Sequence, residues 1–257
     1  SYTITYSSGA LATASQAITV ARADQNALSL TSTSGTYGAA LTLTTSGGSG
    51  TGANTYVVVN GTATGCIESG GVLTVTSAGS CTVTATKALD TNYNAVSSSA
   101  TTVTFVKANQ SSLTLTSTSG TYGAALTLTT SGGTTAGSLS YSVTGTGCSI
   151  TSGSLSKSAA GDCSVTATMA GNGNYEPVSS SATTVSFAKA NQSSLTLTST
   201  SGTYGVALTL TTSGGTTAGS LSYSVTGTGC SITSGALSKS AAGDCSVTAT
   251  MAGNGNY

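Results

Sequence analysis

Histidine is absent from this sequence of 257 residues, and its absence removes several classes of chemistry. The usual hydrolytic triads need a histidine as general base. Acidic residues, the other common general acids and bases, are also scarce. Glycoside hydrolysis needs two carboxyl groups about 5 to 10 Å apart, and the stretch 107–188 offers only Asp162 and Glu176. We therefore expect a protein that is not an enzyme, with no catalytic residue and no cofactor.

Charge of either sign is rare as well. Charged residues make up 5% of the chain, against about 25% in an average soluble protein. The net charge is zero, so no basic patch can neutralise nucleic-acid phosphates. No apolar run approaches the roughly 18 residues of a membrane span. The start, SYTITYSSGA, lacks the basic and apolar regions of a signal peptide. Either such a segment is removed, or the chain is an excerpt of a longer one.

The residues that are abundant favour β-sheets. The chain is rich in serine, threonine, valine, leucine and tyrosine, and it contains 34 glycines. Disordered chains, in contrast, are usually charged and poor in β-branched residues. The composition is therefore typical of a folded protein whose thin sheets have one buried face and are joined by many turns.

Internal repetition is the most informative feature of the sequence. The string KANQSSLTLTSTSGTYG begins at Lys107 and again at Lys189, 82 residues later. Over residues 107–175 the two copies differ at two positions, Ala124 and Ser154. A more divergent copy begins near Arg22 and holds three extra residues in a loop before its first cysteine. A period of 82 exceeds the roughly 20 to 50 residues of solenoid units, so it indicates small domains in tandem.

These copies divide the chain into four segments. Residues 1–21 are predicted to be terminal strands of a preceding or neighbouring domain. Residues 22–106, 107–188 and 189–257 are repeats 1, 2 and 3. The near-identity of repeats 2 and 3 indicates recent duplication and an array longer than this chain. Repeat 3 lacks an equivalent of the last strand of repeat 2, whereas Ser15–Ala21 matches such a strand.

Within each repeat, apolar and polar residues alternate with a period of two. In repeat 2 this alternation places Leu113 and Leu115 on one face, and Leu139, Tyr141 and Val143 on another. The pattern continues in CSIT, SLSKS, CSVTATMA and ATTVSFAK. About seven short strands per repeat, separated by turns, predict an antiparallel sandwich of two sheets.

The order of motifs carries a family resemblance. TYG, LSYSVTGTG, AGDCSVTATMAGNGNY and TTVSFAKANQ follow one another in each copy, in whole or in part. Together they resemble bacterial immunoglobulin-like (Ig-like) repeats, which form long tandem arrays in surface proteins and adhesins. The resemblance covers residues 22–257 and rests on turns and strand patterns. It implies an all-β chain of tandem Ig-like antiparallel β-sandwiches, arranged as an elongated rod, but it does not imply a ligand.

The cysteines depart from the pattern of many such repeats. Each repeat has two, 15 residues apart, on positions that face the predicted core. A zinc site would need four close ligands, and no redox C-x-x-C motif is present. We therefore predict one buried disulfide per repeat rather than free buried thiols, each stabilising its repeat by about 3 kcal/mol. Disulfides indicate an oxidising compartment: the cell surface, the exterior of the cell or the periplasm. The predicted pairs are Cys66–Cys81, Cys148–Cys163 and Cys230–Cys245.

Other candidate sites have simpler interpretations. The segment ALDTNYN around Asp90 could supply calcium ligands, but later copies read MAGNGNY there, so we predict a turn and no metal. Lysines in KANQ are predicted to be solvated at domain junctions rather than in Lys–Asn isopeptide bonds. Tyrosines of GTYG and of the Asn-Tyr turns are predicted to pack against sandwich ends rather than to form a sugar-binding stripe. Glycosylation sequons begin at Asn60, Asn109 and Asn191, but a bacterial source does not imply their modification.

Three functions remain. The main hypothesis is a structural, non-enzymatic module of an extracellular bacterial fibre or adhesin shaft, with further copies of the repeat as its partners. The first alternative is a self-polymerising filament subunit, in which the N-terminal strand of one chain completes the last domain of the next by strand addition. The second alternative is an adhesin module that binds a glycan or a receptor.

Overall fold

The computed structural model describes residues 2–8, 12–134, 137–216 and 219–257, and all regular structure in these ranges is β-strand. The described residues contain no helix that is long and apolar enough to cross a membrane. The chain divides into two compact units. Unit 1 comprises Ser1–Ser111, Thr134–Gly137 and Ala170–Val178, and unit 2 comprises Ser112–Gly133, Ser138–Met169 and Ser179–Tyr257. Unit 1 therefore contains repeat 1 together with the Ala170–Val178 segment of repeat 2.

The chain begins with an antiparallel hairpin of β1 (Tyr2–Ser8) and β2 (Ala12–Ile18). Tyr2 pairs with Ile18, and Ile4 pairs with Gln16. Tyr2, Ile4 and Ile18 are exposed by 68%, 55% and 41%, so an apolar face of the hairpin meets solvent. The segment predicted as terminal strands, 1–21, thus contains two strands, although its residues 1 and 9–11 lie outside the described ranges.

Repeat 1 folds into three small sheets, with orders β3-β6, β5-β9-β8 and β11-β10-β12-β4, and β7 also pairs with β10. All these pairs are antiparallel except β12 with β4, which run parallel. The bounds are β3 (Leu28–Leu30), β4 (Ser34–Thr36), β5 (Leu41–Thr42), β6 (Thr45–Gly47), β7 (Asn54–Asn60), β8 (Ile67–Ser69), β9 (Val72–Thr74), β10 (Gly79–Lys87), β11 (Val96–Ser97) and β12 (Thr101–Val106).

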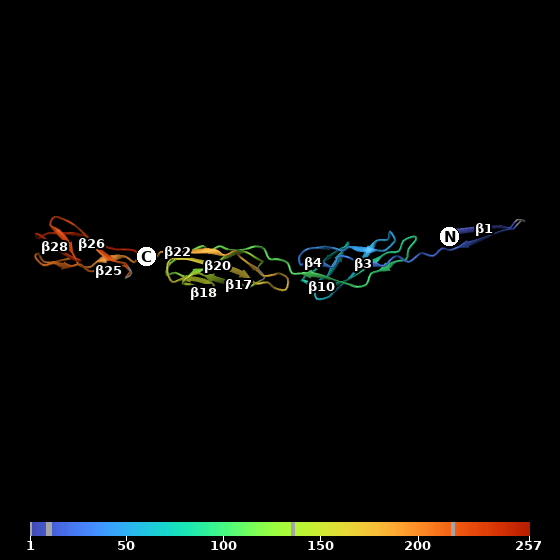
Figure 1. The fold of residues 1–257 in the computed structure, drawn as a ribbon, viewed down its shortest axis with the longest axis horizontal. Helices are drawn as coiled ribbons and strands as arrows, with labels where there is room; N and C mark the ends of the chain where they lie inside the picture. The colour runs from blue at the N-terminus through green and yellow to red at the C-terminus, as the bar shows by residue number, and fades with distance from the viewer. Residues whose placement is uncertain (1, 9–11, 135–136, 217–218) are drawn as a thin grey trace. The chain divides into compact units, whose positions relative to one another are not determined.

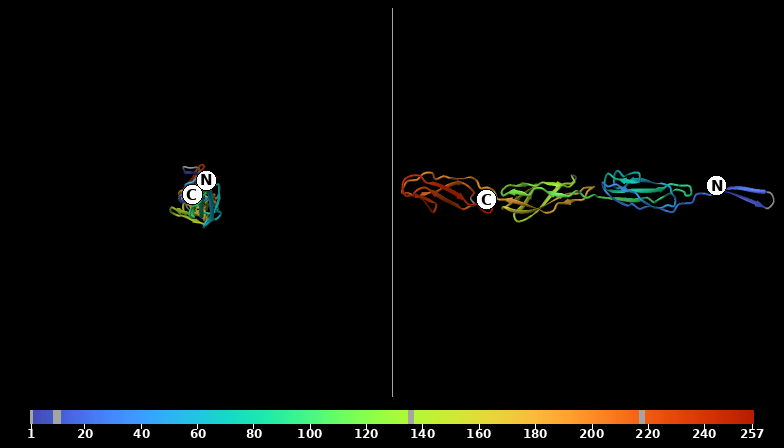
Figure 2. Two further views of the ribbon diagram at one scale, coloured as in Figure 1. Left: turned by 90° about the vertical axis from the view of Figure 1, so that its right-hand side faces the viewer. Right: turned by 90° about the horizontal axis from the view of Figure 1, so that it is seen from above.

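Repeat 2 has the same arrangement, with orders β13-β16, β15-β19-β18 and β14-β22-β20-β17, and β21 pairs with β20 (Figures 1 and 2). Strand β22 lies between β20, to which it is antiparallel, and β14, to which it is parallel. The bounds are β13 (Leu113–Leu115), β14 (Ser119–Thr121), β15 (Leu126–Thr127), β16 (Thr130–Gly132), β17 (Leu139–Thr144), β18 (Cys148–Thr151), β19 (Ser154–Lys157), β20 (Gly161–Met169), β21 (Val178–Ser179) and β22 (Thr183–Ala188).

The cores of repeats 1 and 2 lie between the inward faces of their sheets. In β20, alternate residues Cys163, Val165 and Ala167 are almost fully buried, because successive side chains of a strand point to opposite faces. Val185 and Phe187 of β22 pack into the same core and are exposed by 0% and 3%. The result is a β-sandwich-like fold, as the alternation predicted. The equivalent buried residues of repeat 1 are Cys81, Val83, Ala85, Val103 and Phe105.

Repeat 3 repeats only part of this arrangement within the described residues. Its sheets have orders β23-β25, β24-β28-β27 and β26-β29. Here β29 pairs with β26 alone, and the segment equivalent to β14 forms no strand. The bounds are β23 (Leu195–Leu197), β24 (Leu208–Thr209), β25 (Thr212–Gly214), β26 (Leu221–Thr226), β27 (Cys230–Thr233), β28 (Ala236–Lys239) and β29 (Ser246–Met251).

Two details differ from the sequence-based expectation. The strands are shorter and more numerous, since side-chain hydrogen bonds replace parts of the backbone ladder. After β13, for example, the amide of Thr129 donates to the Ser117 hydroxyl (2.7 Å). Leu139 shares a strand face with Tyr141 and Val143 but is 38% exposed, because it lies at the first position of β17.

Candidate functional site

Each repeat contains one disulfide between the two cysteines that the spacing predicted. In repeat 2 the bond links Cys148 in β18 to Cys163 in β20, with Cα atoms 6.0 Å apart. Cys163 is buried, whereas Cys148 is only half-buried, so the bond reaches from the core towards the rim. No described cysteine is free. The sulfur atoms therefore form cross-links and are not available as nucleophilic thiols. The equivalent bonds Cys66–Cys81 and Cys230–Cys245 have Cα atoms 6.1 and 6.0 Å apart.

A buried glutamine organises the start of each of the first two repeats. Gln110 is 8% exposed, and its Nε2 donates to the carbonyl oxygens of Ala170 (3.1 Å) and Glu176 (2.8 Å). Its Oε1 accepts hydrogen bonds from the amide and the hydroxyl of Thr134. Gln25 makes the equivalent bonds in repeat 1, to Ala88, Asn94, Ser49 and Gly50. Sequence reasoning missed this role, although a glutamine recurs at this position in all three copies.

The turn that Gln110 supports is closed by an asparagine side chain. Asn172 Oδ1 accepts hydrogen bonds from the amides of Asn174 (2.8 Å) and Tyr175 (2.9 Å), which is a turn typical of Asn and Asp. The amide of Ala108 in turn donates to the Asn174 carbonyl (2.9 Å). This attaches the incoming chain of repeat 2 to its Asn-Tyr turn. Repeats 1 and 3 make the same bond, from Ala23 to Asn92 and from Ala190 to Asn256.

The Asn-Tyr turn also contacts the preceding repeat. Within unit 1, Asn174 Oδ1 accepts a hydrogen bond from the backbone amide of Ala78 in repeat 1 (2.9 Å). Within unit 2, Asn256 Oδ1 accepts the equivalent bond from Ala160 in repeat 2 (3.0 Å). Ala78 and Ala160 belong to the loops that lead into β10 and β20. The two contacts are therefore made by the same turn and the same loop, one repeat apart.

Tyrosine rings complete both junctions. The ring of Tyr37 in repeat 1 meets Tyr175 edge to face, with centroids 5.5 Å apart and planes at 87°. Tyr122 and Tyr257 form the same pair at 5.5 Å and 88°. The expectation that the tyrosines pack against sandwich ends is thus incomplete, because these four rings form two pairs, each between neighbouring repeats. Tyr204, the equivalent of Tyr37 and Tyr122 in repeat 3, is 64% exposed.

The polar residues that the sequence offered as candidate calcium ligands or isopeptide partners are either hydrogen-bonded or exposed to solvent. Asp90 takes the place of Asn172 in repeat 1, and its carboxylate accepts bonds from the amides of Thr51, Asn92 and Tyr93. These amides, Thr51 first, hold the pKa of Asp90 below its usual value. No group of three or more potential metal-binding side chains occurs in the described ranges. Lys107 and Lys189 are exposed, and Lys189 Nζ donates to the Asn254 carbonyl.

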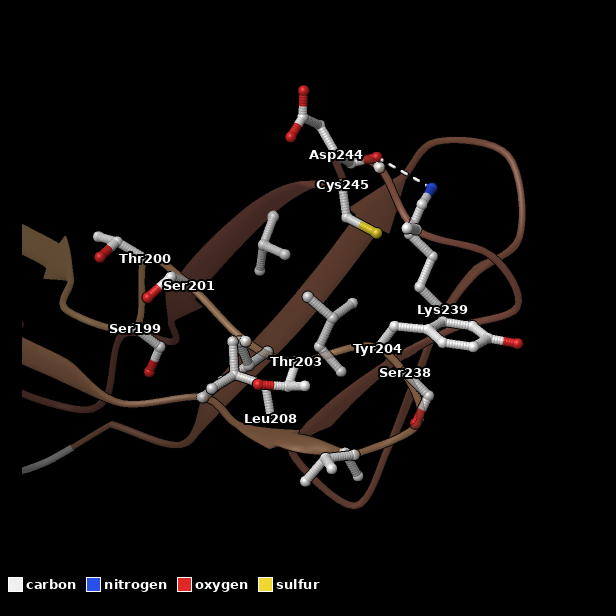
Figure 3. A pocket seen from close by; sticks show the side chains of 18 of the residues that line it. Ser199, Thr200, Ser201, Thr203, Tyr204, Leu208, Ser238, Lys239, Asp244 and Cys245 are labelled. Atoms are coloured by element: carbon white, nitrogen blue, oxygen red, sulfur yellow. Dashed lines mark hydrogen bonds between the residues drawn. The ribbon is translucent and has the colours of Figure 1, made fainter.

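Repeat 3 contains an open groove of about 930 Å³. It is lined by Leu197, residues 199–208, Leu210, residues 237–239 and residues 241–247. Figure 3 shows Cys245 and Leu208 on opposite sides of this space, and the Lys239 amino group bonded to the Asp244 carbonyl (3.1 Å). Cys245, Val247 and Leu237 are partly exposed, whereas their equivalents in repeat 2, Cys163, Val165 and Leu155, are buried.

A comparison with known protein-family models and with curated proteins gives no match, so the function is inferred from the sequence and the structure of this chain.

Proposed function

We propose that this chain is a structural, non-enzymatic module of an extracellular fibre or adhesin shaft, built from tandem Ig-like repeats. One observation carries the proposal: the junction between neighbouring repeats is formed twice from equivalent residues. The hydrogen bond that the Ala78 amide donates to Asn174 Oδ1 recurs 82 residues later between Ala160 and Asn256. The ring pair of Tyr37 with Tyr175 recurs as Tyr122 with Tyr257. Repeats that merely follow one another on a flexible chain have no need of such a specific contact.

The stability of each repeat supports the same proposal. Disulfides persist in oxidising surroundings outside the cytosol, and each repeat contains one. The chain reaches the next repeat through Lys-Ala-Asn-Gln, whose glutamine and alanine are bonded to the Asn-Tyr turn in repeat 2. This connection is short and hydrogen-bonded, unlike a flexible linker rich in glycine and serine. It suits a module that transmits force or holds a distal part away from a surface.

The orientation of neighbouring repeats tests the proposal. Residual dipolar couplings of the full chain, measured by NMR, are expected to fit one common alignment tensor for repeats 1 and 2. Replacing Asn174 and Tyr175 by alanine removes both contacts of the first junction and is expected to give repeats 1 and 2 different tensors. The variant with Asn256→Ala and Tyr257→Ala is the matched control, since it should uncouple repeat 3 while repeats 1 and 2 stay coupled.

Two results would contradict the proposal. The first is independent tensors in the unmodified chain, which would show that the junction does not orient the repeats. The second is specific binding of the chain to a glycan on an array, which would favour the adhesin module that binds a ligand. Turnover of any substrate is not expected, because the sequence has no histidine and few carboxylates to serve as general acids and bases.

A further inference from the structure

Asparagine is followed by glycine at three places in the chain, and two of these places are the same turn of different repeats. Asn172-Gly173 and Asn254-Gly255 lie in the Asn-Tyr turns of repeats 2 and 3, whereas Asn60-Gly61 lies at the end of β7. Asparagine is among the thermolabile residues of proteins. Before glycine it is especially exposed to attack by the next backbone nitrogen, because glycine has no Cβ to hinder the approach. We propose that the two turn asparagines are sites of self-catalysed deamidation, a covalent modification that the turn itself promotes.

The reaction needs no reagent other than water. The Gly173 nitrogen forms a bond to Asn172 Cγ and gives up its proton, and the Cγ–Nδ2 bond breaks, so that the side-chain nitrogen leaves as ammonia. The product is a cyclic succinimide. Water then opens the ring at one of its carbonyl carbons. Opening at Cγ gives aspartate, whereas opening at the main-chain carbonyl gives isoaspartate, in which an extra methylene lies in the backbone.

The hydrogen bonds of the turn lie where this reaction develops charge. Asn172 Oδ1 accepts hydrogen bonds from the amides of Asn174 (2.8 Å) and Tyr175 (2.9 Å). Attack on Cγ converts this oxygen into an oxyanion, and donors that already point at the oxygen stabilise that charge without having to rearrange. The turn of repeat 3 has the same two bonds. The Asn-Tyr turn therefore supplies an oxyanion hole for the attack on its own asparagine.

The attacking nitrogen has no competing partner in the turn. Gly173 is exposed, its amide donates to no acceptor in the described part of the chain, and a Cβ added there would meet no atom within 4 Å. The Gly61 amide, in contrast, donates to the Ser80 carbonyl (2.9 Å), and a Cβ at Gly61 would lie 2.6 Å from Ser80 Oγ. Asn60-Gly61 is therefore an internal comparison, with the same two residues but an attacking nitrogen that is already hydrogen-bonded.

Repeat 1 shows that the turn accepts the aspartate product. Asp90 stands at the position of Asn172, and its Oδ1 accepts hydrogen bonds from the amides of Asn92 and Tyr93, both at 2.8 Å. The equivalent amides in repeat 2 polarise Cγ of the succinimide, so we expect water to open the ring mainly at Cγ. Isoaspartate would instead lengthen the main chain ahead of Asn174, whose side chain contacts repeat 1. Deamidation to aspartate thus adds a negative charge to the turn and keeps this contact.

Peptide mapping of the full chain, aged in mildly alkaline buffer, tests the proposal. After reduction, trypsin separates the three asparagines, because lysines such as Lys87 and Lys189 lie between them. In the folded chain, Asn172 and Asn254 should convert from amide to acid about three- to tenfold faster than Asn60, since attack by the Gly61 nitrogen first requires the loss of a hydrogen bond. In urea the three rates should be nearly equal, because each asparagine is then followed by an unstructured glycine.

Gly173→Ala is the variant that separates chemistry from fold. Gly173 does not have a positive φ, and its added Cβ would meet no atom within 4 Å, so the turn should be unchanged. The methyl group hinders the attacking nitrogen, so conversion at Asn172 should fall to the rate of Asn60 or below, while Asn254 in the same molecule is unaffected.

Three results would overturn the proposal. Equal rates at the three asparagines of the folded chain would remove the role of the turn. Undiminished conversion at Asn172 in the Gly173→Ala variant would show that the glycine nitrogen is not the attacking group. Isoaspartate as the main product at Asn172 would contradict the role of the two amides in ring opening. These measurements report covalent changes and not the orientation of the repeats, so the array proposal and this one can fail separately.

Discussion

At the scale of single residues, Asp90 distinguishes repeat 1 from the others. Amides of Thr51, Asn92 and Tyr93 donate to its carboxylate and lower its pKa from 3.8. A pKa that is lower in the folded state means that folding favours the ionised form. The contribution of Asp90 is therefore present above its unfolded-state pKa of 3.8 and is lost as the pH falls through the lowered pKa of the folded state. We expect repeat 1 to lose stability selectively in acid.

Hydrogen exchange of the full chain between pH 2 and pH 6, corrected for intrinsic rates, measures this effect repeat by repeat. Asn172 and Asn254 hold the equivalent turns without a titrating group. Asp90→Asn should therefore flatten the acid dependence of repeat 1, and Asn172→Asp should introduce one in repeat 2. The explanation fails when repeat 1 and repeat 2 of the unmodified chain respond to acid to the same extent.

A second residue-scale prediction concerns Gly120. Its backbone does not require glycine, but an added Cβ would lie 2.9 Å from the buried ring of Phe187. Gly120→Ala should therefore destabilise repeat 2 by about 1–3 kcal/mol through overpacking. Gly202→Ala in repeat 3 is the matched control, because its Cβ would meet Leu208 at 3.3 Å instead of an aromatic ring. Urea unfolding followed by NMR measures both changes, and an equal cost at the two sites would contradict the role assigned to Phe187.

At the scale of elements, the disulfide is the link between sheets that share no hydrogen-bond ladder. Cys148 lies in the sheet of β15, β18 and β19, and Cys163 lies in the sheet of β20 and β22. Replacing both cysteines of repeat 2 by alanine should lower its unfolding free energy by about 3 kcal/mol, as expected for a loop of this length. Urea unfolding monitored by the NMR signals of repeat 2 measures the loss. Signals of repeats 1 and 3 serve as internal controls, and unchanged stability of repeat 2 would contradict the prediction.

The sequence was most informative about individual strands and the disulfides that link them. The alternation of Cys163, Val165 and Ala167 predicted a half-buried strand, and β20 is such a strand. The disulfide partners followed from spacing. The roles of Gln110 and Asn174 did not, because their partners lie 24 to 96 residues away and a polar residue in a turn has many local alternatives. Their recurrence in each copy was the available signal.

At the scale of the whole molecule, the decisive contacts are those that repeat from one junction to the next. Within repeat 2, Ala108 and Gln110 of the incoming chain donate hydrogen bonds to the carbonyl oxygens of Asn174 and Glu176, at and just after the Asn-Tyr turn. The same turn then contacts the Ala78 loop and Tyr37 of repeat 1. Folding of the base of repeat 2 and its contact with repeat 1 therefore depend on one set of residues. This predicts that neighbouring repeats stabilise each other, as in a one-dimensional array.

A double-mutant cycle on Tyr37 and Tyr175 measures that coupling. Aromatic pairs of this geometry contribute about 0.5–1.5 kcal/mol beyond the area they bury, so the two alanine substitutions should be non-additive by this amount. Unfolding of the full chain, followed separately through signals of repeats 1 and 2, provides the free energies. A cycle on Tyr37 and Tyr257 is the control, because these two rings belong to different junctions and should be additive. Additive losses for Tyr37 and Tyr175 would show that the repeats are stable independently, and the junction would then only position them.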